Sequence, residues 1–279
     1  MDSVQTYVEV LKWASSFLKE NGKDAFLAEY LLLERLGWNK TQLLVSFKKI
    51  MKPVELKQFR EDIAQVVSGI PAQYVIGSTE FYGNRFKVTT DTLIPRPETE
   101  ELVELCLQEN KAPVLNVVDI GTGTGVIGLS LKLNRPDWHV TLIDISKAAL
   151  SVAADNAKKL ALDVDLIESN VLTQYKGSKL DIIISNPPYI SYFEEAVMDE
   201  SVKEYEPNTA LFAEDNGLAV YKDIAKEAQY HLKPKGKIYL EIGYLQGNAV
   251  KKIFQQAFPE KQVDVIKDLN KHDRLVRVG

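Results

Sequence analysis

The chain has 279 residues, of which 45% are hydrophobic and 26% are charged, and this balance is ordinary for a globular protein. That length is enough for two domains, each with its own core. The formal net charge of −5 argues against a general binder of polyanions, because such binding relies on clustered lysine and arginine side chains.

Residue types that form disulfides and metal sites are scarce. Cys106 is the only cysteine, which excludes an internal disulfide, and its position in a helical run favours a place in the core. His139, His231 and His272 are scattered, so no metal site is predicted. No apolar run approaches the length of a membrane span, and Asp2 and Ser3 make the start of the chain polar, so we expect a cytoplasmic protein without membrane contact.

The first seventy or so residues predict a small helical bundle. Apolar residues recur at helical spacing from Val4 to Leu18, and Asn21-Gly22 ends that helix. Three more helices are expected, at 26–37, after Thr41, and from Pro53 to residue 69. Brief connections between them favour a bundle, which we assign to residues 1–72.

Residues 73–96 predict a connecting segment built on a β-hairpin. Residues 80–82 and 85–88 read as short strands on either side of Gly83-Asn84, a pair typical of a two-residue turn with glycine where φ must be positive. A helix is expected to begin near Pro97, and the acidic residues Glu98 and Glu100 are explained by that helix start.

Beyond residue 112 the expected strands and helices alternate. Strands are predicted at 114–120, 140–145, 164–168, 180–185 and 237–242, and helices at 126–134, 147–162, 217–232 and 247–258. Two closing strands, 262–267 and 274–278, have a short link and are expected to pair antiparallel. This pattern predicts an α/β fold for residues 97–279, with a seven-stranded, mostly parallel, Rossmann-like sheet that binds ligands at the carboxyl ends of its strands.

A glycine-rich loop follows the first of these strands. Glycine stands at alternate positions of the run Gly121, Thr122, Gly123, Thr124, Gly125. Such a run permits a tight turn and lets a ligand touch bare backbone. About twenty residues later the second strand ends in Asp144, whose carboxylate is suited to the two hydroxyls of a ribose.

Two cofactors fit this loop. Gly123, Gly125 and Gly128 have the G-x-G-x-x-G spacing of a dinucleotide fold, so an NAD-linked enzyme is a rival interpretation. We favour S-adenosylmethionine, because Asp119 stands just before the glycines, where enzymes that use this cofactor commonly carry an acid. The expected antiparallel pair at the end of the sheet also favours S-adenosylmethionine. So does the run 186–189 after the fourth strand, because it offers no proton-relaying group for hydride transfer.

The fourth strand ends in Asn186-Pro187-Pro188-Tyr189. Two consecutive prolines force extended geometry, so the strand cannot pass directly into a helix. The side-chain oxygen of Asn186 and the carbonyls of Asn186 and Pro187 are left as rigid acceptors, with the ring of Tyr189 beside them. This arrangement suits a planar –NH2 group, although by themselves the four residues fit a proline-rich turn with a satisfied asparagine equally well.

Taken together, these segments resemble the release factor glutamine methyltransferase family, known as PrmC or HemK. The run from Asp119 to Gly125, then Asp144 and then the N-P-P-Y motif occur in the family's order. Flanking segments match as well, and these are 74–77, 80–83, 93–100, 205–207, 210–211, 267–269 and 273–274. The resemblance covers essentially the whole chain.

The resemblance implies a methyl transfer from S-adenosylmethionine to the side-chain amide nitrogen, N5, of the glutamine in the Gly-Gly-Gln motif of class I peptide chain release factors. It implies a substrate-recognition role for residues 1–72. The acidic balance and the lack of an obvious basic recognition domain argue against direct binding of nucleic acid, and we expect a monomer. Three alternatives stay open: glutamine methylation of a ribosomal protein, N6-adenine methylation of nucleic acid, and a non-catalytic adapter that only holds a nucleotide.

Carried over position by position, the resemblance also assigns the site. The cofactor-binding residues are Gly121, Thr122, Gly123, Thr124, Gly125, Asp144, Asn170, Val171 and Asn186. The substrate-binding residues are Asn186, Pro187, Pro188 and Tyr189, and the catalytic residues are Asn186, Pro187 and Tyr189. Asn170 departs from the family, which usually has an acid there, so its adenine contacts carry no charge.

The mechanism expected at this site is alignment. Asn186 Oδ1 and the Pro187 carbonyl each accept one N–H of the target amide, and Tyr189 packs on its flat face. No general base is required before attack, because the methylated nitrogen is strongly acidic and loses its proton afterwards.

Overall fold

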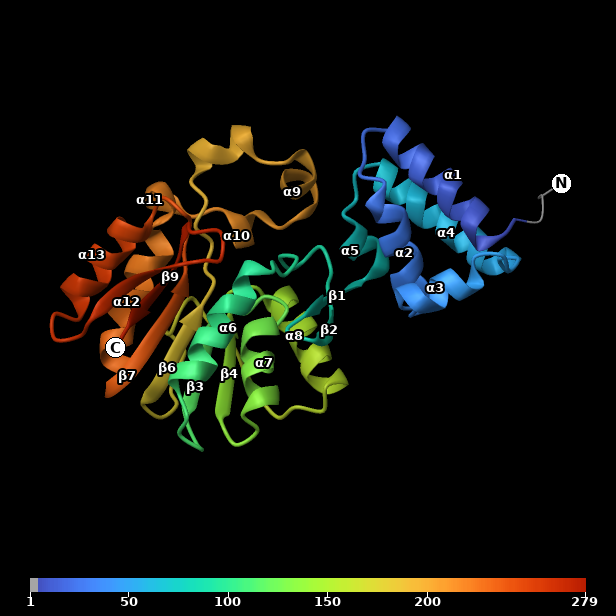
Figure 1. Ribbon diagram of the computed structural model, residues 1–279. Helices are drawn as coiled ribbons and strands as arrows, with labels where there is room; N and C mark the ends of the chain where they lie inside the picture. The colour runs from blue at the N-terminus through green and yellow to red at the C-terminus, as the bar shows by residue number, and fades with distance from the viewer. Residues whose placement is uncertain (1–4) are drawn as a thin grey trace. The chain divides into compact units, whose positions relative to one another are not determined.

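The computed structural model describes residues 5–279 (Figure 1). The chain divides into two compact units, one ending at Ser78 and one covering Thr79–Gly279. The boundary between them falls inside the segment 73–96 that we expected to be a connector, so the division into 1–72, 73–96 and 97–279 stays a prediction. Val4, the expected start of the first helix, lies outside the described residues.

In the described part of the N-terminal unit, five helices pack around a common core. They are α1 (Tyr7–Glu20), α2 (Phe26–Leu36), α3 (Lys40–Ser46), α4 (Pro53–Val67) and α5 (Ala72–Ile76). Thr6 begins α1 through a capping box with Glu9, which satisfies backbone donors that the first turn leaves free. Leu18, Leu31 and Phe59 are fully buried between the helices, and the predicted bundle is confirmed.

The last helix of this unit, α5, was missed by the sequence analysis. It has five residues, which is too short for an apolar repeat to show, and it ends at Gly77 with φ +79°. Arg35 ties it to the bundle by donating to the carbonyl of Val75 at 3.1 Å. The same guanidinium pairs with the fully buried carboxylate of Asp62 on α4 at 2.7 Å.

A β-hairpin follows, made of β1 (Ser78–Phe81) and β2 (Asn84–Lys87). Its turn is Tyr82-Gly83, with φ values of +47° and +72°, so the predicted turn Gly83-Asn84 was wrong by one residue. Tyr82 can hold this costly φ because its N–H donates to Glu100 Oε1 at 2.8 Å. Asn84 lies in the strand and donates from Nδ2 to the Tyr82 carbonyl at 3.0 Å.

Within Thr79–Gly279 the seven strands form one sheet in the order β5-β4-β3-β6-β7-β9-β8. The strands are β3 (Asn116–Ile120), β4 (His139–Asp144), β5 (Asp165–Glu168), β6 (Leu180–Ser185), β7 (Leu232–Glu241), β8 (Val263–Lys267) and β9 (Asp273–Val278). β9 pairs antiparallel with both β7 and β8, while the other pairs are parallel. The predicted fold class and its antiparallel closing pair are confirmed.

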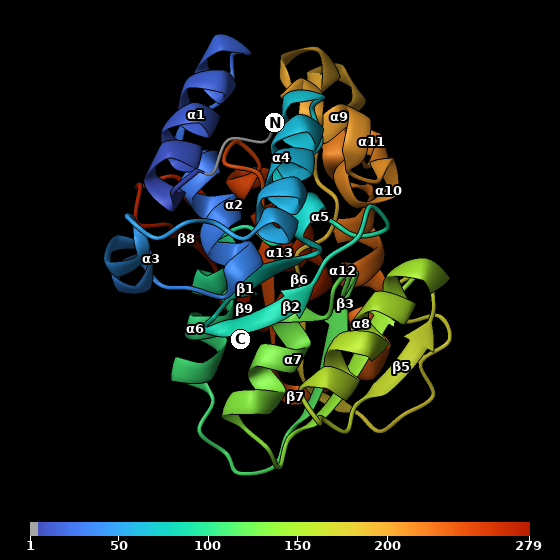
Figure 2. The same ribbon diagram turned by 90° about the vertical axis from the view of Figure 1, so that its right-hand side faces the viewer.

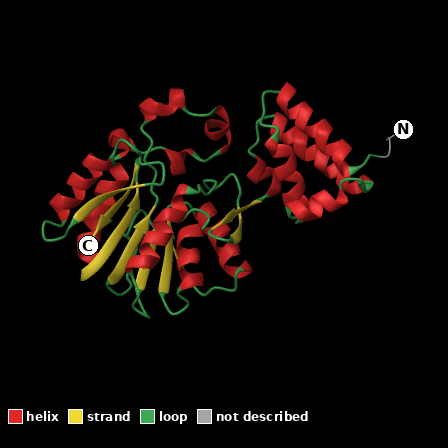
Figure 3. Cartoon of the chain, viewed as in Figure 1, coloured by secondary structure: helices red, strands yellow, loops and turns green. Residues whose placement is uncertain are grey.

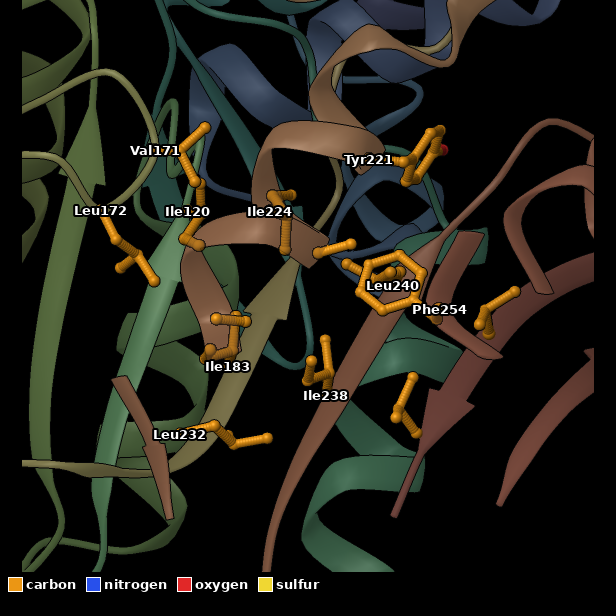
Figure 4. Close-up of a cluster of buried hydrophobic side chains, with 14 of the residues drawn as sticks. Ile120, Val171, Leu172, Ile183, Tyr221, Ile224, Leu232, Ile238, Leu240 and Phe254 are labelled. Atoms are coloured by element: carbon orange, nitrogen blue, oxygen red, sulfur yellow. The ribbon is translucent and has the colours of Figure 1, made fainter. Parts of the chain in front are cut away.

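Helices cover both faces of this sheet (Figure 3). Their bounds are α6 (Glu98–Glu109), α7 (Val126–Asn134), α8 (Lys147–Lys159), α12 (Ala219–His231) and α13 (Gly247–Ala257). Successive residues of β6 divide between two cores: Ile182 and Ile184 pack under α6, α7 and α8, and Ile183 packs under α12 and α13 (Figure 4). α8 lies beside β5 at the edge of the sheet (Figure 2). The core place predicted for Cys106 is confirmed, since it is fully buried on α6.

The segment before α12 and the start of β7 differ from the expectation. Four short helices precede α12, namely η1 (Tyr192–Val197), α9 (Glu200–Tyr205), α10 (Asn208–Leu211) and α11 (Glu214–Gly217), and none was predicted. β7 begins at Leu232, which pairs with Leu180, and not at Lys237, which pairs with Ile182. The residues between these two pairs form an irregularity that contains Pro234 and reads as a turn in the sequence. Of the helices formed by residues 5–279, none has the length and apolar character that crossing a membrane demands.

Candidate active site

A cavity of about 430 Å³ lies at the carboxyl ends of β3, β4, β5 and β6, within the unit Thr79–Gly279. The loops after these strands supply one side of its wall. The other side comes from residues 91–99, which lead into α6, and from residues 208–220, which lead into α12. This position is the one at which open α/β sheets bind their ligands.

The glycine loop is held in shape by backbone hydrogen bonds, one to β4 and one within the loop. Thr122 N donates to the carbonyl of Ile143 at 2.9 Å, and Gly125 N donates to the carbonyl of Thr122 at 2.8 Å. Gly121 and Gly123 have φ values of +67° and +54°, and a Cβ at either would meet no atom within 4 Å. Glycine is therefore required there by the backbone conformation, and open space lies beside the bare chain.

Asp119 lies beneath this loop and holds it to α7. The Asp119 carboxylate is fully buried, and its Oδ2 accepts from Thr122 Oγ1 at 2.6 Å and from Gly128 N at 3.0 Å. Burial raises the pKa of Asp119 to about 7. A Cβ at Gly128 would lie 2.2 Å from Leu142 Cδ2, so this glycine allows the close packing of α7 on the sheet. The G-x-G-x-x-G spacing thus has a structural explanation that needs no dinucleotide.

Asp144 ends β4 at the cavity wall and is 9% exposed. Its Oδ2 accepts from Gly123 N at 2.8 Å and its Oδ1 from Ser146 N at 2.9 Å. Burial raises its pKa above the ordinary value, and these backbone donors lower it. Asn170 and Val171, after β5, line the same cavity. The carboxylate, the loop and this pair therefore face one volume.

Asn186 follows β6 and also lines the cavity. Its Nδ2 donates to Thr99 Oγ1 at 3.2 Å, and Thr99 Oγ1 donates to Glu241 Oε2 at 2.7 Å. Glu241 ends β7 and is 1% exposed. Burial raises the pKa of Glu241 to about 7, and the hydrogen bond from Thr99 and the charge of Arg274 oppose that rise.

The rest of the N-P-P-Y motif divides between the wall and the core. Pro188 lines the cavity, whereas Pro187 is buried and neither it nor Tyr189 belongs to the wall. The backbone carbonyl of Tyr189 accepts from Gln246 Nε2 at 2.9 Å. Burial raises the pKa of the Tyr189 hydroxyl to about 12. A Cβ at Gly217 would lie 2.0 Å from this carbonyl, so the turn before α12 requires glycine. Gly125 also lies outside the wall, where it begins α7.

The segment 191–213 folds against the cavity and was not assigned a role from the sequence. The backbones of Ile190 and Phe212 form a bridge, and the ring of Tyr192 stacks on Phe212 with centroids 5.0 Å apart. Glu206, 5% exposed, accepts from Ile94 N at 3.2 Å and from Arg96 Nη2 at 2.6 Å. Ile94 and Arg96 lie in the segment 93–100 and Glu206 lies in the segment 205–207. The resemblance singled out both segments, but neither sequence indicates that they are in contact.

Comparison with known proteins agrees with this geometry. A family model described as the PrmC N-terminal domain matches residues 9–77, and one described as the methyltransferase small domain matches residues 99–204. The chain is 51% identical over 269 residues to the release factor glutamine methyltransferase of Enterococcus faecalis, with 96% of this chain and 97% of the relative covered. It is 41% identical to the release factor glutamine methyltransferase of Bacillus subtilis, with 98% and 97% covered.

Solved structures share the fold at low sequence identity. The ribosomal protein L11 methylase of Lactobacillus delbrueckii subsp. bulgaricus superposes with a TM-score of 0.52 at 18% identity, covering 72% of this chain and 89% of that one. A methyltransferase of Pyrococcus furiosus superposes with a TM-score of 0.54 at 18% identity, covering 77% and 95%. These likenesses show the methyltransferase fold of the sheet domain.

Proposed function

Because the chain belongs to the release factor glutamine methyltransferase family, we propose that it methylates the side-chain amide nitrogen of the glutamine in the Gly-Gly-Gln motif of class I peptide chain release factors. S-adenosylmethionine is the methyl donor. The observation that carries this function is that one cavity is lined both by the glycine loop with Asp144 and by Asn186. A methyl donor and an amide acceptor can therefore be held next to each other.

The residues at the first half of the cavity fit S-adenosylmethionine. Space is open beside the backbone of Gly121 and Gly123, and the half-satisfied Asp144 carboxylate retains lone pairs that can accept from ribose hydroxyls. Asn170 and Val171 are assigned to the adenine side. When bound, this cofactor supplies an activated methyl group on a sulfonium centre.

Asn186 acts on the amide. An amide nitrogen is a poor nucleophile because its lone pair is delocalised, so the protein contributes chiefly by alignment. With Nδ2 engaged by Thr99, Asn186 presents Oδ1 as the acceptor for an N–H of the glutamine. This bond orients the nitrogen and favours the positive charge that develops on it during transfer.

Two further roles stay predictions. One is the Pro187 carbonyl as the second acceptor of the target amide, and the other is the Tyr189 ring packed on that amide. Neither Pro187 nor Tyr189 lines the cavity. The N-terminal unit is assigned to recognition of the release factor, because methyl transfer itself needs only the sheet domain. We propose a monomer that acts in the cytoplasm, where release factors work, and that binds no nucleic acid directly.

The function is tested by incubating the full chain with labelled S-adenosylmethionine and, in separate reactions, release factor, ribosomal protein and DNA. We expect label on the release factor alone, and labelling about 10²-fold slower or more with the Asn186→Ala variant. Label on ribosomal protein or DNA in place of the release factor would overturn the assigned substrate. Tight binding of NAD together with no binding of S-adenosylmethionine would overturn the reaction class.

A further inference from the structure

A chain of hydrogen bonds connects the core to the cavity through three side chains. Glu241 ends β7, Thr99 lies in the first turn of α6, and Asn186 follows β6. Thr99 donates to Glu241 Oε2 at 2.7 Å and accepts from Asn186 Nδ2 at 3.2 Å. Thr99 is 3% exposed and Glu241 is 1% exposed, so water does not compete for these bonds.

The donors and acceptors of these three hydrogen-bonded side chains permit one orientation of the Asn186 side-chain amide. A threonine hydroxyl has a single hydrogen, and Thr99 gives it to the carboxylate, so it presents only lone pairs to Asn186. An ionised carboxylate also only accepts, and the nearby Asn186 side chain lowers the pKa of Glu241. The –NH2 group of Asn186 must therefore face Thr99 and Glu241, which turns Oδ1 the other way.

We propose that Thr99 and Glu241 are positioning residues that fix the side-chain amide of Asn186 with Oδ1 toward the acceptor amide. The inference rests on the proposed function, in which Oδ1 accepts an N–H of the target glutamine. In the reversed orientation Nδ2 would meet that N–H, so that two donors face each other. The two buried residues thus determine whether the site attracts or repels the nitrogen to be methylated.

This arrangement depends on the charge of Glu241. A protonated Glu241 can itself donate a hydrogen bond, which frees the Thr99 hydroxyl to donate to Asn186 and removes the preference. Burial raises the pKa of Glu241 to about 7, so the orientation is fixed above this pH and lost below it. The other groups that act on Glu241 are the charges of Arg274 and Glu98, with the hydroxyls of Tyr189 and Tyr221 nearby.

Nuclear magnetic resonance of the full chain tests the orientation without any substrate. The Asn186 side-chain –NH2 signals are assigned by their loss in Asn186→Ala. We expect these signals to shift as pH rises through about 7, and to stay constant in Glu241→Gln. Their exchange with water should be about tenfold faster in Thr99→Val than in Thr99→Ser, which keeps the hydroxyl. Signals that do not titrate, or equal exchange in the two Thr99 variants, would overturn the inference.

Single-turnover methylation of release factor tests the consequence. Thr99→Val should lower the rate about tenfold or more, whereas Thr99→Ser stays within about threefold of wild type. The matched control is Thr141→Val, a buried threonine of β4 outside the cavity wall, whose rate should not change. Affinity for S-adenosylmethionine should be the same in all of them.

The acid side of the pH–rate profile separates the roles of two buried carboxylates. The wild-type rate should fall below about pH 7, and Glu241→Gln should be slow throughout and lack that fall. If the rate of Glu241→Gln still falls below about pH 7, the group that titrates is Asp119, whose pKa is also raised to about 7. That result would overturn the role of Glu241. If the wild type does not methylate release factor, the proposed function fails, and the resonance experiment still decides the orientation.

Discussion

The two halves of the cavity are built in different ways. The half proposed to hold the cofactor is a contiguous loop, of which residues 121–124 line the cavity, together with the carboxylate of Asp144 on the neighbouring strand of the sheet. The amide half depends on side chains from three distant elements, since Asn186 meets Thr99 across 87 residues of sequence and Thr99 meets Glu241 across 142. We therefore expect changes in the first half to alter cofactor affinity, and changes in the second to alter the rate of transfer.

The largest effect is expected from Asn186→Ala. The variant loses the oxygen proposed to accept the amide N–H during transfer, so single-turnover rates on release factor should fall by about 10²-fold or more. Affinity for S-adenosylmethionine, measured by calorimetry, should change little. A rate within about threefold of wild type would contradict the role of Asn186 in transfer and the difference proposed between the two halves.

Asp144→Ala should show the opposite pattern. Loss of the carboxylate that we propose accepts from the ribose is expected to weaken cofactor binding by about 1.5–3 kcal/mol, the range for a hydrogen bond to a charged group. The transfer rate at saturating cofactor should stay close to that of wild type. Asp155→Ala is the matched control, because Asp155 is exposed on α8, where it pairs with Lys87 and does not line the cavity.

Glu241→Gln is expected to lower the transfer rate and to raise the free energy of unfolding above about pH 7. The pKa of Glu241 is raised from 4.5 to about 7 in the folded chain, so the stability this group contributes is full below about pH 4.5 and lost as pH rises through 7. Glutamine does not titrate. The free energy of unfolding of the variant relative to wild type should therefore increase between pH 5 and 8, by on the order of 2 kcal/mol. Denaturant unfolding at the two pH values measures it, and an unchanged difference would contradict the buried, ionised Glu241.

The smallest effect concerns the N-terminal unit. A fragment beginning at Thr79 keeps Phe81 and Phe86, which are buried in the core of the sheet domain, whereas a fragment beginning near residue 90 loses both. We expect the Thr79–Gly279 fragment to bind S-adenosylmethionine and to methylate whole release factor several-fold more slowly than the full chain. A Gly-Gly-Gln peptide should be modified at similar rates by both, because it offers no surface beyond the loop. Equal rate ratios for protein and peptide would give the N-terminal unit a role in stability alone.

The comparison also explains what the sequence can predict. The glycine loop, Asp144 and the N-P-P-Y run are local patterns with a direct chemical meaning, and the structure brings most of their residues to one cavity. The alternation of strands and helices likewise predicts the sheet, because its apolar periods extend over many residues.

What the sequence does not reveal depends on contacts between distant segments or on very short ones. Thr99 reads as an ordinary residue of a helix start, and only the fold places it between Glu241 and Asn186. α9 and α10 have six and four residues, too few for a periodic pattern. The turn at Tyr82-Gly83 depends on Glu100, which is distant in sequence and satisfies the Tyr82 N–H.

The most direct test of the account is the position of the methyl group. Release factor is incubated with the full chain and S-adenosylmethionine, digested, and mapped by mass spectrometry with fragmentation of the Gly-Gly-Gln peptide. We predict one added methyl group on the side-chain nitrogen of that glutamine, formed more slowly by about 10²-fold or more when Asn186→Ala replaces the wild type. A methyl group on any other residue, or on the glutamine with Asn186→Ala at the wild-type rate, would contradict it.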